Sequence, residues 1–356
     1  MKAVHLTRLS ENIKIRNLQN FYAGHWCKPQ EKITKNFLKY NQSSKQIDLN
    51  INKTISFLAK KLNFYHKKNF SNKFWRIVLL PYVNAISYVV LDRYNIINKL
   101  HKIKNIKYFL VADKKLNNFV FDDYQDFAIN VNSHDFNNNI FFQLLKIKTK
   151  KKFKYFKAKK KIKKTKKIQS IFYNMKKFIS SFSNRKVVFY NSNLSLFKNY
   201  DLYLKYFFYN DDKIIIKNNK TDLNFRNNKI ENKLRNKLNF QEILNFFSFK
   251  YLPRSYLENL NLLMSYTKKK RIPKNPLIVV TASSHIHDDF FKIWYGLIKE
   301  KFINTKLFVL QYGSQYNLKR DDKTKLTYDL CDKKLNWGSC TLNKKKGIFI
   351  GANLNL

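Results

Sequence analysis

The chain has 356 residues, of which 44% are apolar and 16% aromatic, and it contains only six Gly and five Pro. This composition supplies enough apolar surface for a core, and it excludes globally disordered, collagen-like and Pro/Gly-rich low-complexity chains. Lys and Arg number 71 against 23 Asp and Glu, so the formal net charge is +48.

The first part of the chain predicts two short strands followed by two helices. The strands are expected at residues 3–6 and 20–23. Residues 51–65 place apolar side chains three, four and seven positions after Ile55, which is the spacing of one helical face. A second helix is predicted over residues 74–100. Its apolar residues run all round, so we expect it to be buried.

The middle of the chain predicts a strand at residues 106–112, a helix at 140–147 and a strand at 187–191. Residues 146–167 hold Lys at 14 of 22 positions. Such a block is usually a solvated helix face or a disordered insertion. Residues 211–233 are rich in Asn and Lys with little periodicity, which predicts a loop or a frayed helix.

The clearest α/β pattern lies in the last third of the chain. Residues 240–268 are helical by pattern, with a break at Pro253. A buried strand at 277–283, an amphipathic helix at 288–301 and a second strand at 307–313 follow. A strand, helix and strand at this spacing predict a parallel unit, so the fold class is α/β.

Cysteine usage and apolar runs point to a soluble cytoplasmic protein. Cys27, Cys331 and Cys340 are too few for a disulfide framework, and none forms a CxxC pair that would suit zinc. The N-terminal residues lack the apolar region of a secretory signal. The longest apolar run, residues 77–91, is shorter than the ~20 residues of a membrane span.

The positive charge has two explanations that stay open. A strongly basic chain is typical of proteins that bind nucleic acid or an anionic membrane surface. Alternatively, the abundant Lys, Asn, Ile, Phe and Tyr are encoded by AT-rich codons, and mutational drift in an AT-rich genome would produce the charge without a partner.

Polar residues follow both strands of the last α/β unit. Ser283, Ser284 and His285 follow the first strand, and a polar turn from Gln311 to Tyr316 follows the second. Ligands of open parallel sheets bind beyond the carboxyl ends of the strands, where such groups suit a phosphate or a sugar hydroxyl. Alternatively, either serine caps the 288–301 helix. For His285, an acid–base role and a structural role both stay open.

A second polar motif, Gly24-His25-Trp26-Cys27, follows the strand at 20–23. Its specificity is low, and taken alone it is better explained by a packed Trp beside a surface His. The chain has no P-loop, GxGxxG or HExxH motif. The adjacent Asp pairs at 288–289 and 321–322 fit helix starts or turns, so no metal is expected.

Six segments stand out together, and their order along the chain is informative. They are FYAGHWC (21–27), LAKKLNFYHKKNFSNKFWRIVLLPYVNAISYVVLDRY (58–94), YLPRSYLENL (251–260), PLIVVTASSHIHDDFFKIW (276–294), LFVLQYGSQYN (307–317) and LCDKKLNWGS (330–339). In this order they resemble a family of transferases encoded in bacterial O-antigen and surface-polysaccharide gene clusters. That family resembles glycosyltransferases with two Rossmann domains (GT-B) and, more distantly, the transferases that polymerise teichoic acids.

The resemblance implies a Rossmann-like parallel sheet with flanking helices, equivalent to the N-terminal, acceptor-binding half of a GT-B transferase. Together, pattern and resemblance assign His285, Tyr312 and His25 to catalysis. The substrate-binding residues assigned in the same way are Ser283, Ser284, Gln311, Gly313, Ser314, Tyr316, Trp26, Arg76 and Trp337.

The chain departs from the family pattern in two places. The family has a His where Tyr312 stands, and a Tyr with a pKa near ~10 is a poor base at neutral pH. The family also continues past the Trp-Gly motif into a second Rossmann-like domain that would bind a nucleotide-activated donor, whereas this chain stops at Leu356. We therefore expect no cofactor in the chain itself, and little or no activity of the chain alone.

The expected organisation is one α/β domain formed by residues 1–145 and 171–340. A lysine-rich insertion at 146–170 interrupts it, and residues 341–356 begin a linker to the absent donor domain. The expected partners are a separate donor-domain chain and a lipid-linked saccharide acceptor at the cytoplasmic face of a membrane. The lysines of 146–167 would contact that anionic surface, unless they form an insertion with no role.

Two rival hypotheses remain. The chain could be a non-catalytic interaction subunit of such a transferase, as the missing His and the missing domain would suggest. It could also be a basic nucleic-acid-binding protein, since counterion release would explain the charge directly. The second rival explains the ordered Trp-bearing segments poorly, and nucleic-acid recognition favours Arg over the Lys that predominates here.

Overall fold

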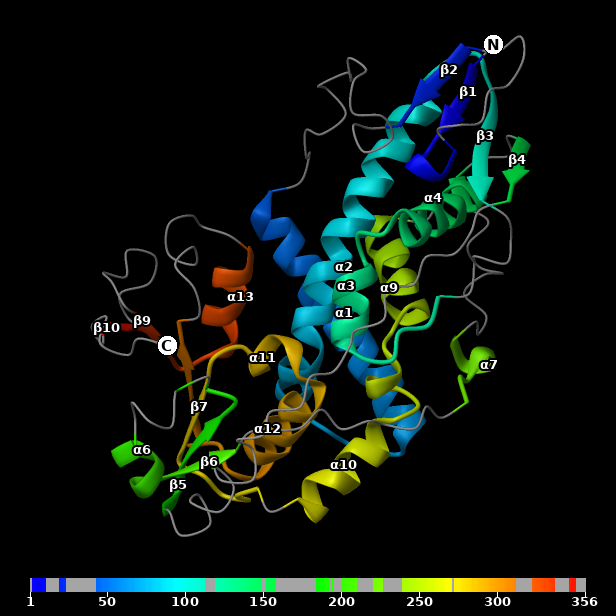
Figure 1. Ribbon diagram of the computed structural model, residues 1–356. Helices are drawn as coiled ribbons and strands as arrows, with labels where there is room; N and C mark the ends of the chain where they lie inside the picture. The colour runs from blue at the N-terminus through cyan, green and yellow to red at the C-terminus, as the bar shows by residue number, and fades with distance from the viewer. Residues whose placement is uncertain are drawn as a thin grey trace. The chain divides into compact units, whose positions relative to one another are not determined.

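The computed structural model describes most of the chain and divides it into two compact units (Figure 1). The first unit comprises Met1–Leu58, Tyr82–Thr165 and Lys220–Arg254, and the second comprises Ala59–Pro81, Lys166–Asn219 and Ser255–Leu356. The described residues are 2–10, 19–23, 43–112, 119–148, 152–157, 184–192, 194, 200–209, 220–226, 239–270, 272–311, 322–336 and 346–349.

The first unit is built on a four-stranded sheet of order β2-β1-β3-β4, in which every neighbouring pair is parallel. Its described elements are β1 (Lys2–His5), η1 (Arg8–Ser10), β2 (Gln19–Tyr22), β3 (Ile106–Ala112), α3 (Tyr124–Asn130), α4 (His134–Lys148), β4 (Lys152–Phe156), α7 (Leu223–Arg226) and α9 (Phe240–Lys250). Two long helices, α1 (Ser44–His66) and α2 (Asn72–His101), contribute residues to both units.

The second unit carries a six-stranded sheet of order β10-β9-β8-β7-β5-β6, which is parallel throughout. Its described elements are β5 (Asn184–Tyr190), α6 (Tyr200–Lys205), β6 (Tyr206–Tyr209), α10 (Leu260–Lys269), β7 (Ile278–Thr281), α11 (Ser284–His287), α12 (Asp289–Lys301), β8 (Lys306–Leu310), α13 (Asp322–Leu330), β9 (Lys333–Asn336) and β10 (Gly347–Phe349). The short helix η5 (Arg254–Tyr256) begins on the last residue of the first unit and continues into the second.

The predicted α/β class, with parallel strands flanked by helices, is confirmed. The pattern at residues 277–313 predicts a parallel strand, helix and strand, and β7, α12 and β8 form that unit with β7 and β8 paired in parallel. The structure differs in having two parallel sheets where the sequence pattern and the resemblance predict one. In each sheet the first strand lies between the second and the third, so each sheet has a point where the strand order reverses.

Part of the lysine block is neither a helix face nor an insertion. Lys152–Phe156 forms β4, and it pairs with β3 from Tyr108–Lys152 to Ala112–Phe156. Phe153 and Tyr155 pack on the Phe142 ring of α4, with ring centroids 5.4 and 5.9 Å away. Lys alternates here with Phe153 and Tyr155, which is the pattern of a strand. The high lysine content makes this pattern hard to recognise in the sequence. Residues 158–167 lie outside the described part of the chain.

The expected domain boundaries are left as predictions. Those at residues 170 and 340 lie outside the described part, and residue 145 lies within α4. Within the Asn/Lys-rich stretch at 211–233, residues 223–226 form the short helix α7.

Helix α2 is buried, as predicted from the apolar residues that occur on all sides of it. Its large side chains include Trp75 and Tyr82, which are both fully buried. The helix has 30 residues, so it exceeds the apolar run at 77–91 and is long and apolar enough to cross a membrane. Because 72% of its most apolar window is buried inside the structure, it also meets the description of a core helix of a folded protein.

Cationic side chains close the carboxyl ends of three described helices. Arg226 donates to the Leu252 carbonyl just after α9 at 2.5 Å, and Lys299 donates to the Thr305 carbonyl after α12 at 2.7 Å. Lys346 donates to the Cys331 carbonyl after α13 at 2.9 Å. These carbonyls lie one to four residues beyond the helices, where a positive charge is favourable, so the cations hold the segments that follow the helix ends. Some of the excess charge is therefore structural.

We expect Gly296→Ala to destabilise the second unit. A Cβ at Gly296 on α12 would lie 2.8 Å from Cδ2 of Phe74, and this ring is stacked on Phe70 at a centroid distance of 4.2 Å. Overpacking should cost about 1–3 kcal/mol, offset by about 0.5–1 kcal/mol of helix propensity. Urea unfolding of the variant measures the net loss. In Gly296→Ala/Phe74→Leu the clash is relieved, so Gly296→Ala should cost less there than alone. An equal cost in both backgrounds would contradict the packing account.

Candidate functional site

The carboxyl edge of the six-stranded sheet forms the candidate site. The strand order reverses between β5 and β7, and ligands of open parallel sheets bind at such a point. Tyr190 ends β5, and Thr281 ends β7 just before the short helix α11 (Figure 1). The Tyr190 hydroxyl donates to Oδ2 of Asp288 at 2.9 Å and so joins the end of β5 to the start of α12.

His285 is the residue with the most distinctive environment at this edge. Its side chain is 4% exposed, and its Nε2 lies 3.1 Å from the Thr327 hydroxyl on α13. Its Nδ1 is buried and has no hydrogen-bond partner among the described residues. A buried polar atom without a partner costs free energy, so such an atom in a folded protein calls for a role. His285 is therefore the first candidate at this edge for a residue that acts on a ligand.

Burial, together with the positive charges of His287, Lys292 and Lys334, lowers the pKa of His285 from 6.5 to about 3. The imidazole is therefore neutral at pH 7. Its Nδ1 can accept a hydrogen bond from a hydroxyl or donate one to an oxygen, depending on the tautomer. A negatively charged ligand beside Nδ1 would raise this pKa and favour uptake of a proton.

A buried ion pair fixes the backbone that carries His285. Nζ of the fully buried Lys292 lies 2.7 Å from Oδ1 of Asp289, 2.7 Å from the Tyr256 hydroxyl and 3.1 Å from the Ile286 carbonyl. An ammonium has three hydrogens, and these three acceptors use them all. Because Ile286 follows His285 directly, Lys292 holds the turn of α11 in place.

Asp289 has further partners of its own on η5. The Tyr256 hydroxyl donates to Oδ1 of Asp289 at 2.6 Å, and the Ser255 hydroxyl donates to Oδ2. His66 in turn lies with Nε2 3.1 Å from the Tyr256 carbonyl. These hydrogen bonds satisfy a buried carboxylate, so Asp289 and Lys292 position α11 and are not themselves open to a ligand.

The serines do not cap the 288–301 helix, so that alternative is wrong. Oδ1 of Asp288 accepts the hydrogen bond from the Phe291 amide at 3.0 Å and caps α12, as expected for a helix-start Asp. Asp288 is better placed than either serine because it directly precedes the first helical residue. Ser283 makes no side-chain cap bond to α11 either.

The structure brings some predicted site residues together and leaves others undescribed. Ser284 and His285 follow β7, and Gln311 follows the adjacent strand β8, all three being buried. Ser283 is half-buried beside them, whereas Arg76 lies half-buried on helix α2 and not at a strand end. The predicted residues outside the described part are His25, Trp26, Tyr312, Gly313, Ser314, Tyr316 and Trp337.

Sequence reasoning missed Thr327, Tyr190 and the Lys292–Asp289 pair. The spacing of Asp289 and Lys292 by three residues on a helix was a usable signal for the pair. No comparable signal marks Thr327, because α13 is a mostly polar helix. Among the described residues, no group of three or more His, Cys, Asp or Glu side chains is placed to hold a metal ion.

The shifted pKa of His285 predicts a pH-dependent stability. The unfolded chain takes up a proton on this imidazole as the pH falls below about 6.5, whereas the folded chain resists it down to about pH 3. The contribution of His285 to the free energy of unfolding is therefore complete above pH 6.5 and is lost on acidification. Between pH 7 and pH 4, protonation of this imidazole should cost the unaltered protein about 3 kcal/mol of its free energy of unfolding. His285→Gln should not show this part of the loss. Urea unfolding of both proteins measures it, and parallel pH curves would contradict it.

Comparison with known proteins assigns the family. The sequence model described as LIC12162 family transferase matches residues 2–353, which is nearly the whole chain. No curated protein and no solved structure matches the chain. The family model covers nearly the whole chain, and the assignment rests on it. The chain therefore belongs to the LIC12162 transferase family.

Proposed function

We propose that the protein transfers a glycosyl or related activated group during assembly of a bacterial surface polysaccharide, with its reactive site at the carboxyl edge of the six-stranded sheet. The site is inferred from the buried imidazole of His285, which lies near a reversal of strand order and whose Nδ1 has no hydrogen-bond partner in the part of the chain that the structure describes. The transferase family and the resemblance to surface-polysaccharide enzymes support the reaction class.

In this proposal His285 acts on the hydroxyl group of the acceptor. A neutral imidazole can accept the hydroxyl proton at Nδ1 as the oxygen attacks the activated carbon or phosphorus of the donor. The bond from that atom to the nucleotide breaks in the same step, and the nucleotide leaves with the bonding electron pair on its phosphate oxygen. In the protein without substrate, the low pKa of His285 keeps the ring unprotonated. Binding of an anionic donor raises this pKa. Ser284 and Gln311, at the ends of adjacent strands, supply polar groups for the sugar hydroxyls.

The acceptor is proposed to be a lipid-linked saccharide, presented at the cytoplasmic face of a membrane. The need for a separate donor-domain chain is still a prediction. The second parallel sheet is a reason to assay the chain alone first, because the two-Rossmann-domain transferases that it resembles also use two such sheets.

The test is a transfer assay with labelled nucleotide sugars and a lipid extract of the source cells as acceptor. The proposal predicts label in the lipid fraction when the protein is present with its partner chain or alone. If only the partnered protein transfers label, the donor-domain prediction is supported. If neither preparation transfers label from any nucleotide sugar, the transfer proposal fails.

A further inference from the structure

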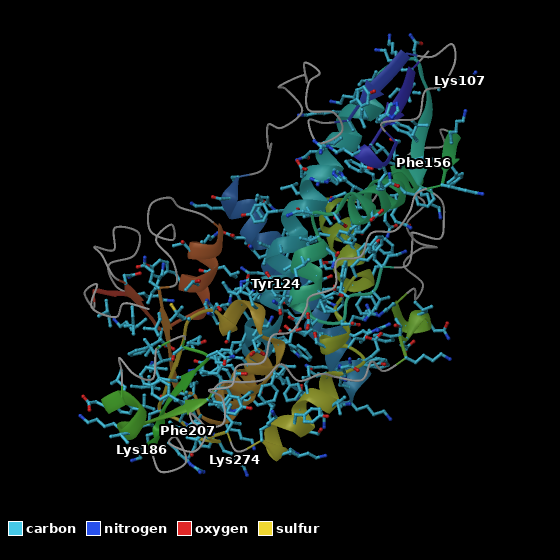
Figure 2. All side chains as sticks on the ribbon, viewed as in Figure 1. Lys107, Tyr124, Phe156, Lys186, Phe207 and Lys274 are labelled. Carbon is cyan, nitrogen blue, oxygen red and sulfur yellow. The ribbon has the colours of Figure 1, made fainter. Side chains whose placement is uncertain are left out.

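The last strand of the four-stranded sheet, β4, carries exposed lysine and tyrosine side chains at its end. Lys154, Tyr155 and Lys157 are exposed at the end of β4, and Tyr155 keeps 44% of its surface accessible. Within the described residues, β4 is the edge strand of its sheet, with β3 as its neighbour. Figure 2 labels Phe156, which ends this strand.

Helix α4 extends this surface. Nζ of Lys146 lies 5.4 Å from the centroid of the Phe142 ring, and Tyr155 packs edge-on against the same ring. Lys146 is exposed at the end of α4. Lys146 and Tyr155 therefore meet at the Phe142 ring, and Lys154 and Lys157 precede and follow Tyr155 along β4 and its end. We call Lys146, Lys154, Tyr155 and Lys157 the basic edge.

The segments that build the basic edge contain no acidic residue. Residues 140–148 of α4, residues 152–157 around β4 and residues 106–112 of the paired strand β3 hold no Asp or Glu. The same segments hold no Arg. The charged side chains of these segments are therefore all positive, which suits an extended anionic partner.

We propose that the basic edge binds the anionic surface of a lipid bilayer. A lysine near such a surface adds affinity through its charge without a fixed geometry, roughly fivefold each. Tyrosine is favoured at the bilayer interface because its ring is apolar and its hydroxyl polar. RNA recognition would use Arg forks and open aromatic faces, whereas the Tyr155 ring is held against Phe142. This inference does not depend on the proposed transfer reaction.

Vesicle binding by the full chain tests the inference. Vesicles of phosphatidylcholine with phosphatidylglycerol should bind the protein, and vesicles of phosphatidylcholine alone should not. The variant Lys146→Gln/Lys154→Gln/Lys157→Gln should lose roughly 100-fold in affinity for the anionic vesicles. Added salt should weaken binding by the unaltered protein.

A matched variant removes the same charge elsewhere. Lys60, Lys61 and Lys68 are exposed on or just after α1, and replacing all three with Gln should change vesicle affinity less than about threefold. Equal losses in both triple variants would show binding by net charge alone and overturn the inference. Release of the protein from anionic vesicles by an equal charge of single-stranded RNA would overturn it in favour of a nucleic-acid partner.

Discussion

Replacing His285 with Gln should slow group transfer by about 10²–10⁴-fold, the usual contribution of a positioned acid–base group. Gln can keep the hydrogen bond to the Thr327 hydroxyl, so the local fold should persist, but it cannot take up the proton of the acceptor hydroxyl. The rate of transfer from a labelled nucleotide sugar to lipid acceptor, at saturating substrate, is the measurement. Circular dichroism and the unfolding midpoint at pH 7 confirm that the variant is folded.

A neighbouring histidine gives the control. His287 is half-buried two residues further along, at the end of α11. His287→Gln should transfer at a rate within about threefold of the unaltered protein, since His287 lowers the pKa of His285 less than burial does and is not the group that takes up the proton. Similar rates for His285→Gln and the unaltered protein would remove His285 from the reaction and leave it a structural residue.

Asp289→Ala should destabilise the protein by about 3–5 kcal/mol. The substitution leaves the Lys292 ammonium, which is fully buried, without its carboxylate. It also leaves the hydroxyls of Tyr256 and Ser255 without their acceptor. The free energy of unfolding in urea, measured at pH 7, gives the loss.

Two further variants isolate the ion pair. The double variant Asp289→Leu/Lys292→Met removes both charges. It should be more stable than Asp289→Ala, which leaves the charge of Lys292 buried without a counter-charge. The pair of half-buried Arg254 and exposed Asp122, 2.9 Å apart, serves as a surface control, and Asp122→Ala should cost less than about 1 kcal/mol. Equal costs for Asp289→Ala and Asp122→Ala would contradict the burial argument.

The local elements were largely predictable because their patterns are short-range. The buried run at 277–283 and the helical spacing after it identify β7 and α12, and the apolar periphery of 74–100 identifies the buried helix α2. The division into two sheets was not predictable in this way. Strand neighbours are chosen by packing over long sequence separations, and nothing local in β3 indicates that it joins β1 and not the strands of the second unit.

The candidate site was predictable in place but not in chemistry. The pattern puts His285 at a strand end, yet only the fold shows that Nε2 reaches Thr327 while Nδ1 has no partner among the described residues. The serine cap was wrong because Asp288 stands nearer the helix start. Within the lysine block, β4 was missed because net charge masked the alternation of Phe153 and Tyr155 with lysine.

The nitrogen-15 resonance of the His285 Nδ1 in the full chain tests the central claim most directly. It can be assigned by its absence in His285→Gln and followed while the donor and acceptor of the transfer assay are added. We predict that this resonance shifts as Nδ1 gains a hydrogen bond, over the same substrate range that saturates transfer. Transfer that saturates while the Nδ1 resonance stays unchanged would contradict a reactive site at this sheet edge.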